Sequence, residues 1–239
     1  MEQQRELFGG RAPASLGELE AAVVGCVACP RLVAWRVEVA ETKRAAFRDD
    51  EYWGRPVPGF GDPEARIAVI GLAPAAHGAN RTGRMFTGDR SGDWLYRAMF
   101  KAGLANQPTS THRDDGLELS DAWITAPVRC APPQNKPTPA ERANCTLWFD
   151  TELGLLPNVS VYLTLGQIAY HALWAHLGRI GCDLPRPRPT FSHGAEVAVD
   201  DLTILMSYHV SQQNTFTGRL TVEMLDEVFS GAVALVREG

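Results

Sequence analysis

Short apolar runs alternate with longer segments of helical pattern along most of the chain. The apolar runs, typical of strands buried on both faces of a sheet, are residues 66–70, 122–128, 159–165 and 202–208. The segments with helical spacing or helix-start signals are residues 15–26, 91–103, 138–154, 167–178 and 221 onward. Strands that alternate with helices of this length form parallel sheets covered by helices on both faces. The pattern therefore predicts an α/β fold.

Three polar loops, rich in glycine or proline, leave the carboxyl ends of predicted strands at residues 71–90, 129–137 and 209–220. Parallel sheets of this kind bind their ligands beyond these ends. The first loop contains little that can build a core, and its small residues let the backbone approach a ligand closely. A flexible surface loop is the alternative. The variety of polar side chains in the loop favours a site.

Several side chains in these loops are candidates for binding a flat, polar ligand. His209 directly follows a predicted strand, and Asn135 and Lys136 lie in a loop that prolines stiffen. Phe86 has two interpretations, a platform for ring stacking or ordinary core packing. The histidines that we interpret as structural or merely exposed are His112, His171, His176 and His193.

Composition limits the classes of protein that fit. With 239 residues, of which 45% are hydrophobic, the chain can bury a sizeable core as one large or two small domains. Its net charge of −5 excludes a surface that binds nucleic acid throughout, but it allows a local basic cleft. The chain has no long uncharged apolar segment, and its first residues lack a signal-peptide pattern. We therefore expect a cytoplasmic protein that does not enter a membrane.

The cysteines have a spacing that points to ligation. Cys26 and Cys29 form a C-x-x-C pair, Cys130 and Cys145 follow much later, and Cys182 has no assigned role. A disulfide framework is not expected in a reducing compartment. The spacing favours a metal ion or an iron–sulfur cluster over isolated buried thiols.

Four stretches together resemble the family 5 (B-type) uracil-DNA glycosylases, which are iron–sulfur members of the uracil-DNA glycosylase superfamily. They read CVACPRLVAWR, GLAPAAHGANRTGRMFTGD, RCAPPQNKPTPAERANC and SYHVSQQNTFTGRL, from Cys26 to Leu220. The resemblance implies a single-domain α/β/α sandwich over residues 1–239 with a central four-stranded parallel sheet. It also implies a glycosylase that removes uracil from DNA, leaves an abasic site and acts as a monomer.

The same resemblance implies a [4Fe–4S] cluster held by Cys26, Cys29, Cys130 and Cys145, which ties the N-terminal segment to the rest. Zinc is the main alternative ligand. Structural zinc sites, however, usually have a second closely spaced cysteine pair, which is missing here.

Each predicted site residue takes a role from the resemblance. Asp89 would position water and stabilise the sugar cation, although a helix-cap role is the alternative. His209 would donate a hydrogen bond to the leaving base, and Phe86 would stack on it. The residues expected to bind the base edge are Gly71, Leu72, Ala73 and Asn135. The residues expected to contact DNA are Arg81, Arg84, Lys136, Gln212, Gln213, Asn214 and Arg219.

Two features suggest how this chain departs from other superfamily members. Leu72 and Ala73 stand where others keep a group that handles the attacking water, and neither can polarise water. The small Ala73 leaves room, so we expect further deaminated bases, such as hypoxanthine and xanthine, to be substrates. Lys136 is the only lysine near the predicted site, so we expect no lyase step through a Schiff base.

Two other functions remain open at this point. An iron–sulfur protein that binds nucleic acid or senses redox state would explain the cysteines, but it gives Asp89, Asn135 and His209 no role. A protein that captures uracil-DNA without turnover is the second alternative, because Leu72 and Ala73 cannot activate water. The sequence assigns no role to residues 178–195.

Overall fold

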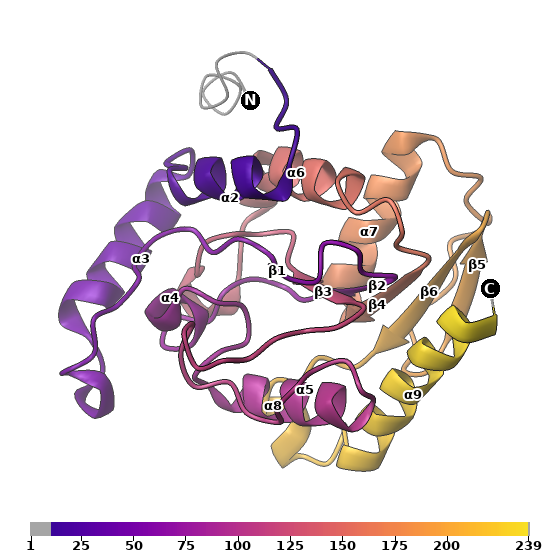
Figure 1. The fold of residues 1–239 in the computed structure, drawn as a ribbon. Coiled ribbons are helices and arrows are strands. Elements are labelled where there is room, and N and C mark those ends of the chain that lie inside the picture. Colours follow the sequence, from indigo (N-terminus) through magenta and orange to yellow (C-terminus); the bar gives the residue numbers. More distant parts are fainter. Residues whose placement is uncertain (1–10, 239) are drawn as a thin grey trace.

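The central sheet has six strands in the order β1-β3-β2-β4-β6-β5 (Figure 1). The strands are β1 (Phe60–Gly61), β2 (Ile67–Ile70), β3 (Ala122–Thr125), β4 (Val161–Leu165), β5 (Glu196–Val199) and β6 (Leu202–Ser207). The four central strands β3, β2, β4 and β6 are mutually parallel, and β1 and β5 join the edges antiparallel. The α/β fold is therefore confirmed, while a sheet of only four strands is wrong.

The two additional strands are those whose sequences carry the weakest signals. The strand β1 has two residues, and one of them is the glycine Gly61. The strand β5 alternates exposed and buried residues over only four positions. The central strands β2, β3 and β4 are instead buried at every position, as expected for strands covered on both faces.

The computed structural model describes residues 11–238. Residues 1–10 and 239 lie outside this range. They are part of the predicted domain, and residues 1–10 are those in which we expect no signal peptide. Its helices and short 3₁₀ turns are α2 (Leu16–Val24), α3 (Pro30–Thr42), η1 (Ala45–Phe47), α4 (Ala79–Thr82), α5 (Arg90–Lys101), η2 (Pro133–Asn135), α6 (Pro139–Gly154), α7 (Gln167–Ile180), α8 (Gln212–Phe216) and α9 (Val222–Glu238). No helix in the described part is long and apolar enough to cross a membrane.

The helices cover the two faces of the sheet in separate layers. The helices α5 and α9 pack on one face, and α6 and α7 lie on the other (Figure 1). A third, smaller core joins α2 and α3 to α6 and includes Cys29, Cys130 and Cys145. The N-terminal helices therefore attach to the sandwich at the cysteines.

Helix starts follow their sequence signals. Thr138 and Glu141 form the predicted capping box at the start of α6, with both reciprocal hydrogen bonds present. Ser15 caps α2 by accepting a hydrogen bond from the Glu18 amide, but the Glu18 carboxylate instead accepts one from the Ala14 amide. The helix α6 therefore begins at a fixed residue directly after the loop that carries Asn135.

Residues 181–195, which the sequence left without a role, run back from the end of α7 to the carboxyl end of β6. The Tyr170 hydroxyl donates to the carbonyl of Pro189 at 2.9 Å, which holds the segment against α7. At its end, His193 Nδ1 accepts a hydrogen bond of 3.1 Å from the Tyr208 amide. The segment therefore supports the residue that precedes His209.

A buried ion pair joins β3, the loop after it and α6. Arg129 and Glu152 are 1% and 3% exposed at their side chains, and Arg129 Nη2 lies 2.7 Å from Glu152 Oε2. The same carboxylate also accepts hydrogen bonds from the Thr125 hydroxyl and the Gly59 amide. Every oxygen of the buried carboxylate thus has a donor, which is what burial of a charge requires.

We expect Glu152→Ala to lower the free energy of unfolding by about 3–5 kcal/mol, because it leaves the Arg129 charge buried without a partner. Urea unfolding followed by circular dichroism measures the loss. Arg11→Ala is the matched control: it removes one partner of the exposed Arg11–Glu18 pair, and we expect it to cost less than about 1 kcal/mol. Equal losses in the two variants would contradict the structural role of the buried pair.

Candidate active site

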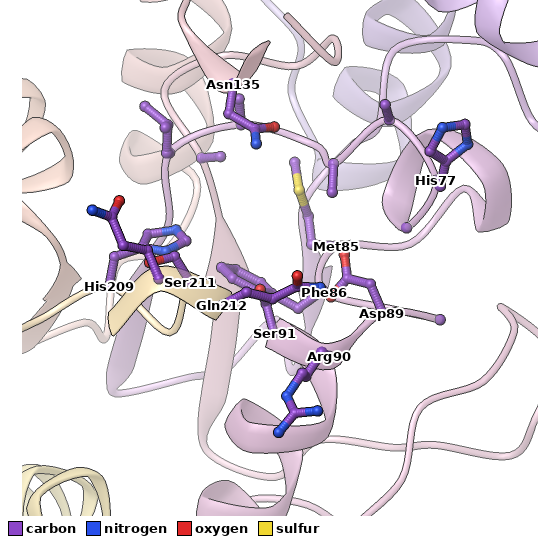
Figure 2. A pocket seen from close by; sticks show the side chains of 18 of the residues that line it. His77, Met85, Phe86, Asp89, Arg90, Ser91, Asn135, His209, Ser211 and Gln212 are labelled. Carbon is purple, nitrogen blue, oxygen red and sulfur yellow. The ribbon is translucent and has the colours of Figure 1, made fainter. Parts of the chain in front are cut away.

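A cavity of about 730 Å³ opens at the carboxyl edge of the sheet, where the three predicted loops meet. Asp89, Asn135 and His209 line it together, although they are far apart in the sequence (Figure 2). Phe86, Leu72, Ala73, Gln212 and Gln213 also belong to its wall. The predicted convergence of these loops at one cavity is therefore present.

Asp89 begins the helix α5 and reaches the cavity at the same time. One carboxylate oxygen accepts a hydrogen bond of 3.0 Å from the Gly92 amide, which makes Asp89 the helix N-cap. The other oxygen lies against Gly78, where an added Cβ would come within 2.0 Å of it. Burial raises the pKa of this carboxyl group, and the amides of Gly92 and Ser91 oppose that rise. Asp89 caps α5 and also lines the cavity, so both interpretations of Asp89 fit.

His209 stands across the cavity on the loop after β6. Burial lowers the pKa of its imidazole to about 4, so the ring is neutral at pH 7 and can donate one N–H. The backbone around it is fixed, because the Asn214 side-chain amide donates to the His209 carbonyl at 2.8 Å. Gly166 lies beside it, and a Cβ there would approach the His209 Cβ within 3.2 Å. The site therefore offers a positioned neutral donor.

Phe86 lies in the wall of the cavity in an uncommon backbone conformation. Its φ of 52° is in the left-handed region, which costs strain for a residue with a bulky side chain. Two glycines make room for it: an added Cβ would come within 2.7 Å of the ring at Gly71 and within 1.8 Å of the Phe86 carbonyl at Gly92. The ring centroid lies 6.2 Å from that of His209. The loop is thus built to present this ring.

The expected base-edge residues divide into two groups. Leu72 and Ala73 line the cavity, and their backbone amides make no hydrogen bond within residues 11–238. Asn135 lies across the cavity from Asp89, at the tip of the proline-rich loop (Figure 2). Gly71 is different, because its amide donates to the Thr125 carbonyl at 2.8 Å within the sheet. The Gly71 amide is therefore already bonded within the sheet and Gly71 makes room for Phe86, while its expected contact with a base stays a prediction.

Two arginines expected at the DNA surface are structural. Arg84 is 4% exposed and bonds to Asp115, Thr87 and Ser110. Arg81 pairs with Asp50 at 2.6 Å and also donates to the carbonyls of two loop residues, His77 and Gly88. Both guanidinium groups are engaged in ion pairs and hydrogen bonds that stabilise the loop 71–90. The expectation that they contact phosphate is therefore not supported by their positions.

The remaining expected DNA residues differ in their positions relative to the cavity. Gln212 and Gln213 are exposed and line the cavity, whereas the Asn214 side chain is engaged with the His209 carbonyl. Lys136 is exposed next to Asn135 without lining the cavity, and the Arg219 guanidinium lies 4.5 Å from the Tyr208 ring centroid. Their contacts with DNA stay predictions.

The cavity also includes residues that the sequence did not indicate. His77, in the first loop, accepts or donates a hydrogen bond of 3.0 Å with the Tyr52 hydroxyl. Burial, with Arg44 and Arg81, lowers the pKa of its imidazole. Arg44 and Phe47 reach the wall from η1, and Arg90 reaches it from the start of α5. Only the place of His77 and Arg90 within or beside the polar loop could have suggested them.

The four predicted ligand cysteines come together around a second, small cavity. Cys26, Cys29, Cys130 and Cys145 all line it. Arg36 Nη1 donates to Cys130 Sγ at 2.9 Å, and Asn144 Nδ2 donates to Cys29 Sγ at 3.4 Å. Among residues 11–238, no group of three or more histidine, cysteine, aspartate or glutamate side chains is arranged to hold a metal ion. Cys182 lies outside this cavity.

Comparison with known proteins decides the family. The family model for the uracil DNA glycosylase superfamily matches residues 58–231, which include all three loops. A type-5 uracil-DNA glycosylase of Thermus thermophilus is 56% identical over 214 residues, covering 89% of this chain and 94% of that protein. The chain belongs to the type-5 family of the uracil DNA glycosylase superfamily.

Further type-5 relatives come from distant organisms. The type-5 uracil-DNA glycosylase of Mycobacterium bovis is 52% identical over 231 residues, covering 96% of this chain and 84% of that protein. The type-5 uracil-DNA glycosylase of Pyrobaculum aerophilum is 46% identical over 212 residues, covering 89% of each chain. The likeness to type-5 proteins thus extends over most of the chain, and the family resemblance of the sequence motifs is confirmed.

We expect His209 of this type-5 protein to titrate at about pH 4, because burial disfavours the charged ring. The unfolded histidine titrates near 6.5, so the unfolded chain binds the proton first as pH falls. The stability that neutral His209 contributes is therefore complete above pH 6.5 and is lost progressively toward pH 4. NMR titration of the histidine ring signals measures the midpoint, and His209→Gln identifies the signal. A midpoint at the ordinary value would show that the ring is solvated.

Proposed function

We propose that this protein is a monofunctional uracil-DNA glycosylase, which hydrolyses the bond between uracil and deoxyribose in DNA and leaves an abasic site. The observation that carries the proposal is one cavity that joins a carboxylate, a side-chain amide and a neutral imidazole, Asp89, Asn135 and His209. The name shared by the type-5 relatives supports the same substrate.

The target bond is hidden inside a DNA duplex, so the nucleotide must leave the base stack. Turning it out costs a few kcal/mol, and a mispaired uracil costs less than a paired base. The cavity receives the base on the Phe86 ring, which the glycine contacts hold in one orientation. Gln212 and Gln213 stand at the opening, where they can contact the duplex beside the gap.

Bond cleavage places negative charge on the departing base and positive charge on the sugar. His209 donates its N–H to a base oxygen as that oxygen gains charge, and a neutral donor suits this step because it needs no proton uptake. The Asp89 carboxylate lines the cavity, where it stabilises the sugar cation and orients the attacking water. The charges that develop on base and sugar thus each have a partner.

The base edge is recognised by groups on the opposite wall. Asn135 offers a donor and an acceptor, and the amides of Leu72 and Ala73 offer donors. Because Leu72 and Ala73 carry no polar side chain in a roomy cavity, we propose that larger deaminated bases also fit. Hypoxanthine and xanthine are therefore expected substrates beside uracil.

We expect Asp89→Asn and His209→Ala each to lower the rate of base release by roughly 10²–10³, because each removes a charge or donor needed in the transition state. Oligonucleotides containing uracil, hypoxanthine or xanthine, treated with protein and then alkali, break at the abasic site. Asp93→Asn, another acidic residue in the first turn of α5, is the control and should keep full activity. Binding of uracil-DNA without strand breakage by the unaltered protein would instead favour a non-turnover binder.

We also propose that Cys26, Cys29, Cys130 and Cys145 hold a [4Fe–4S] cluster. The residues fit such a group: four thiols from three segments line one cavity, and Arg36 and Asn144 donate to two of the sulfurs. When bound, the cluster supplies a structural cross-link between α3 and α6.

We expect purified protein to be brown and to contain about four iron atoms and four sulfides per chain. Cys130→Ser should lose the colour and most of the iron, because it removes one ligand. Cys182→Ser is the control, since Cys182 lies outside the cavity, and it should keep both. A colourless protein holding stoichiometric zinc after anaerobic preparation would overturn the cluster.

Three further proposals complete this function. The protein acts as a monomer in one domain, because residues of a single chain line the whole cavity. It works in the cytoplasm, where thiols stay reduced, since none of the cysteines forms a disulfide. It performs no lyase step, because no lysine lines the cavity among the described residues.

A further inference from the structure

A second cleft lies between the first half of α6 and the stretch of α7 from His171 to Arg179. Its volume is about 200 Å³, and its wall includes Arg142 of α6 and His171 of α7. Arg188, on the segment 181–195 that packs against α7, acts electrostatically on His171. Three nitrogen-rich side chains from separate parts of the chain thus gather at one place.

Two of the positive charges around this cleft have no carboxylate partner among residues 11–238. Arg142 and Arg188 are exposed, and neither belongs to an ion pair within residues 11–238. Arg179, also in the wall, differs because it pairs with Asp150 at 2.7 Å. The charged groups that face His171 are Arg188 and Arg142, which together with burial lower the pKa of its imidazole. A protein with a net charge of −5 therefore keeps unpaired cations here, where an anion would relieve their repulsion.

The loop that follows β3 borders both the cleft and the base cavity. The loop that follows β3 contributes Ala126 and Asn135 to the base cavity, and Pro127 and the first α6 residue, Pro139, to the second cleft. Lys136 is exposed on the same loop, between the two. The helix α7 follows β4 directly and α6 follows the loop after β3, so both helices begin near the carboxyl ends of the strands, where the base cavity also lies. A duplex whose target nucleotide enters the cavity would extend over this end of the sheet.

We propose that Arg142, His171 and Arg188 form a second DNA contact that holds backbone phosphates of the duplex beside the flipped nucleotide. The inference rests on the proposed function, since it places DNA over the base cavity. Arginine suits this role because its planar guanidinium matches phosphate geometry, and His171 adds an uncharged N–H donor. Contacts to phosphate position the duplex without reading its sequence.

The proposal also gives the segment 181–195 a purpose. Prolines at 185, 187 and 189 stiffen it, and the Tyr170–Pro189 hydrogen bond fixes it to α7. Arg188 lies between two of these prolines and directly before the anchored residue. The segment therefore carries an arginine back to the carboxyl edge of the sheet, where a shorter connection from α7 to β5 would place none.

The test compares Arg142→Gln/Arg188→Gln with the unaltered protein in binding a duplex with a central uracil and an otherwise identical undamaged duplex. The slope of log affinity against log salt concentration is negative, and each lost phosphate contact reduces its magnitude by about 0.9. We therefore expect the magnitude of the slope to be about 1.8 smaller in the double variant. Affinity at low salt should fall equally for both duplexes. The single-turnover rate of uracil release at saturating protein should stay unchanged, because neither arginine lines the base cavity.

Arg237→Gln is the matched control. Arg237 is exposed near the end of α9. Its neighbour Val236 accepts a hydrogen bond from Arg66, which directly precedes β2, so Arg237 lies near the amino ends of the strands, away from the base cavity. It should leave the salt dependence unchanged. As a second measurement, the NMR ring signals of His171 should shift when the undamaged duplex is added.

The outcomes separate this inference from the proposed function. The second DNA contact is overturned by an unchanged salt slope in the double variant, or by a loss of affinity that is restricted to the uracil duplex. In either case, uracil release by the unaltered protein still upholds the proposed function. No uracil release by the unaltered protein, together with a reduced slope in the variant, would overturn the function and keep the contact. Circular dichroism checks that the double variant is folded, so that a changed slope reflects the loss of the two arginines.

Discussion

The buried pair of Arg129 and Glu152 is the interaction on which the arrangement of both candidate sites depends. It fixes the path of the chain directly after β3, because Glu152 also binds the Thr125 hydroxyl at the end of that strand. Cys130 directly follows Arg129 in the chain, and α6 supplies both Glu152 and Cys145. From there the loop continues to Asn135 in the base cavity. One desolvated ion pair therefore sets the position of the cysteine cavity and one wall of the base cavity together.

Close packing in the first loop shows why its composition is so restricted. Gly71, Gly78 and Gly92 each touch a group of the site, namely the Phe86 ring, the Asp89 carboxylate and the Phe86 carbonyl. A methyl group at any of them would collide with that partner. Arg81 and Arg84 then close the loop from the other side with ion pairs. These contacts maintain the strained backbone of Phe86. The loop is therefore a preformed part of the binding site and not a mobile loop that closes over it.

The sequence predicts the central strands and the meeting of three loops well, because buried parallel strands and their polar ends have strong local patterns. The edge strands escaped prediction, since β1 has only two residues and β5 alternates exposed and buried residues over four positions instead of forming a continuous apolar run. Arg81 and Arg84 were misjudged for a different reason: a basic residue in a polar loop has the same local signal whether it faces solvent or a carboxylate from a distant segment. Asp50 and Asp115, which pair with them, could be recognised only from the folded chain. For the same reason no local signal indicates that Arg44 and Phe47 belong to the cavity wall.

Those last two residues follow α3, whose N-cap is Cys29, and the Arg81 guanidinium also lies 3.9 Å from the Phe47 ring centroid. The Asn80 side chain also ties α3 to the first loop by donating to the Arg36 carbonyl. Whatever secures the start of this helix therefore also secures one side of the base cavity. If iron secures it, a cell starved of iron would lose part of its capacity to repair deaminated DNA, even with the polypeptide present in full amount.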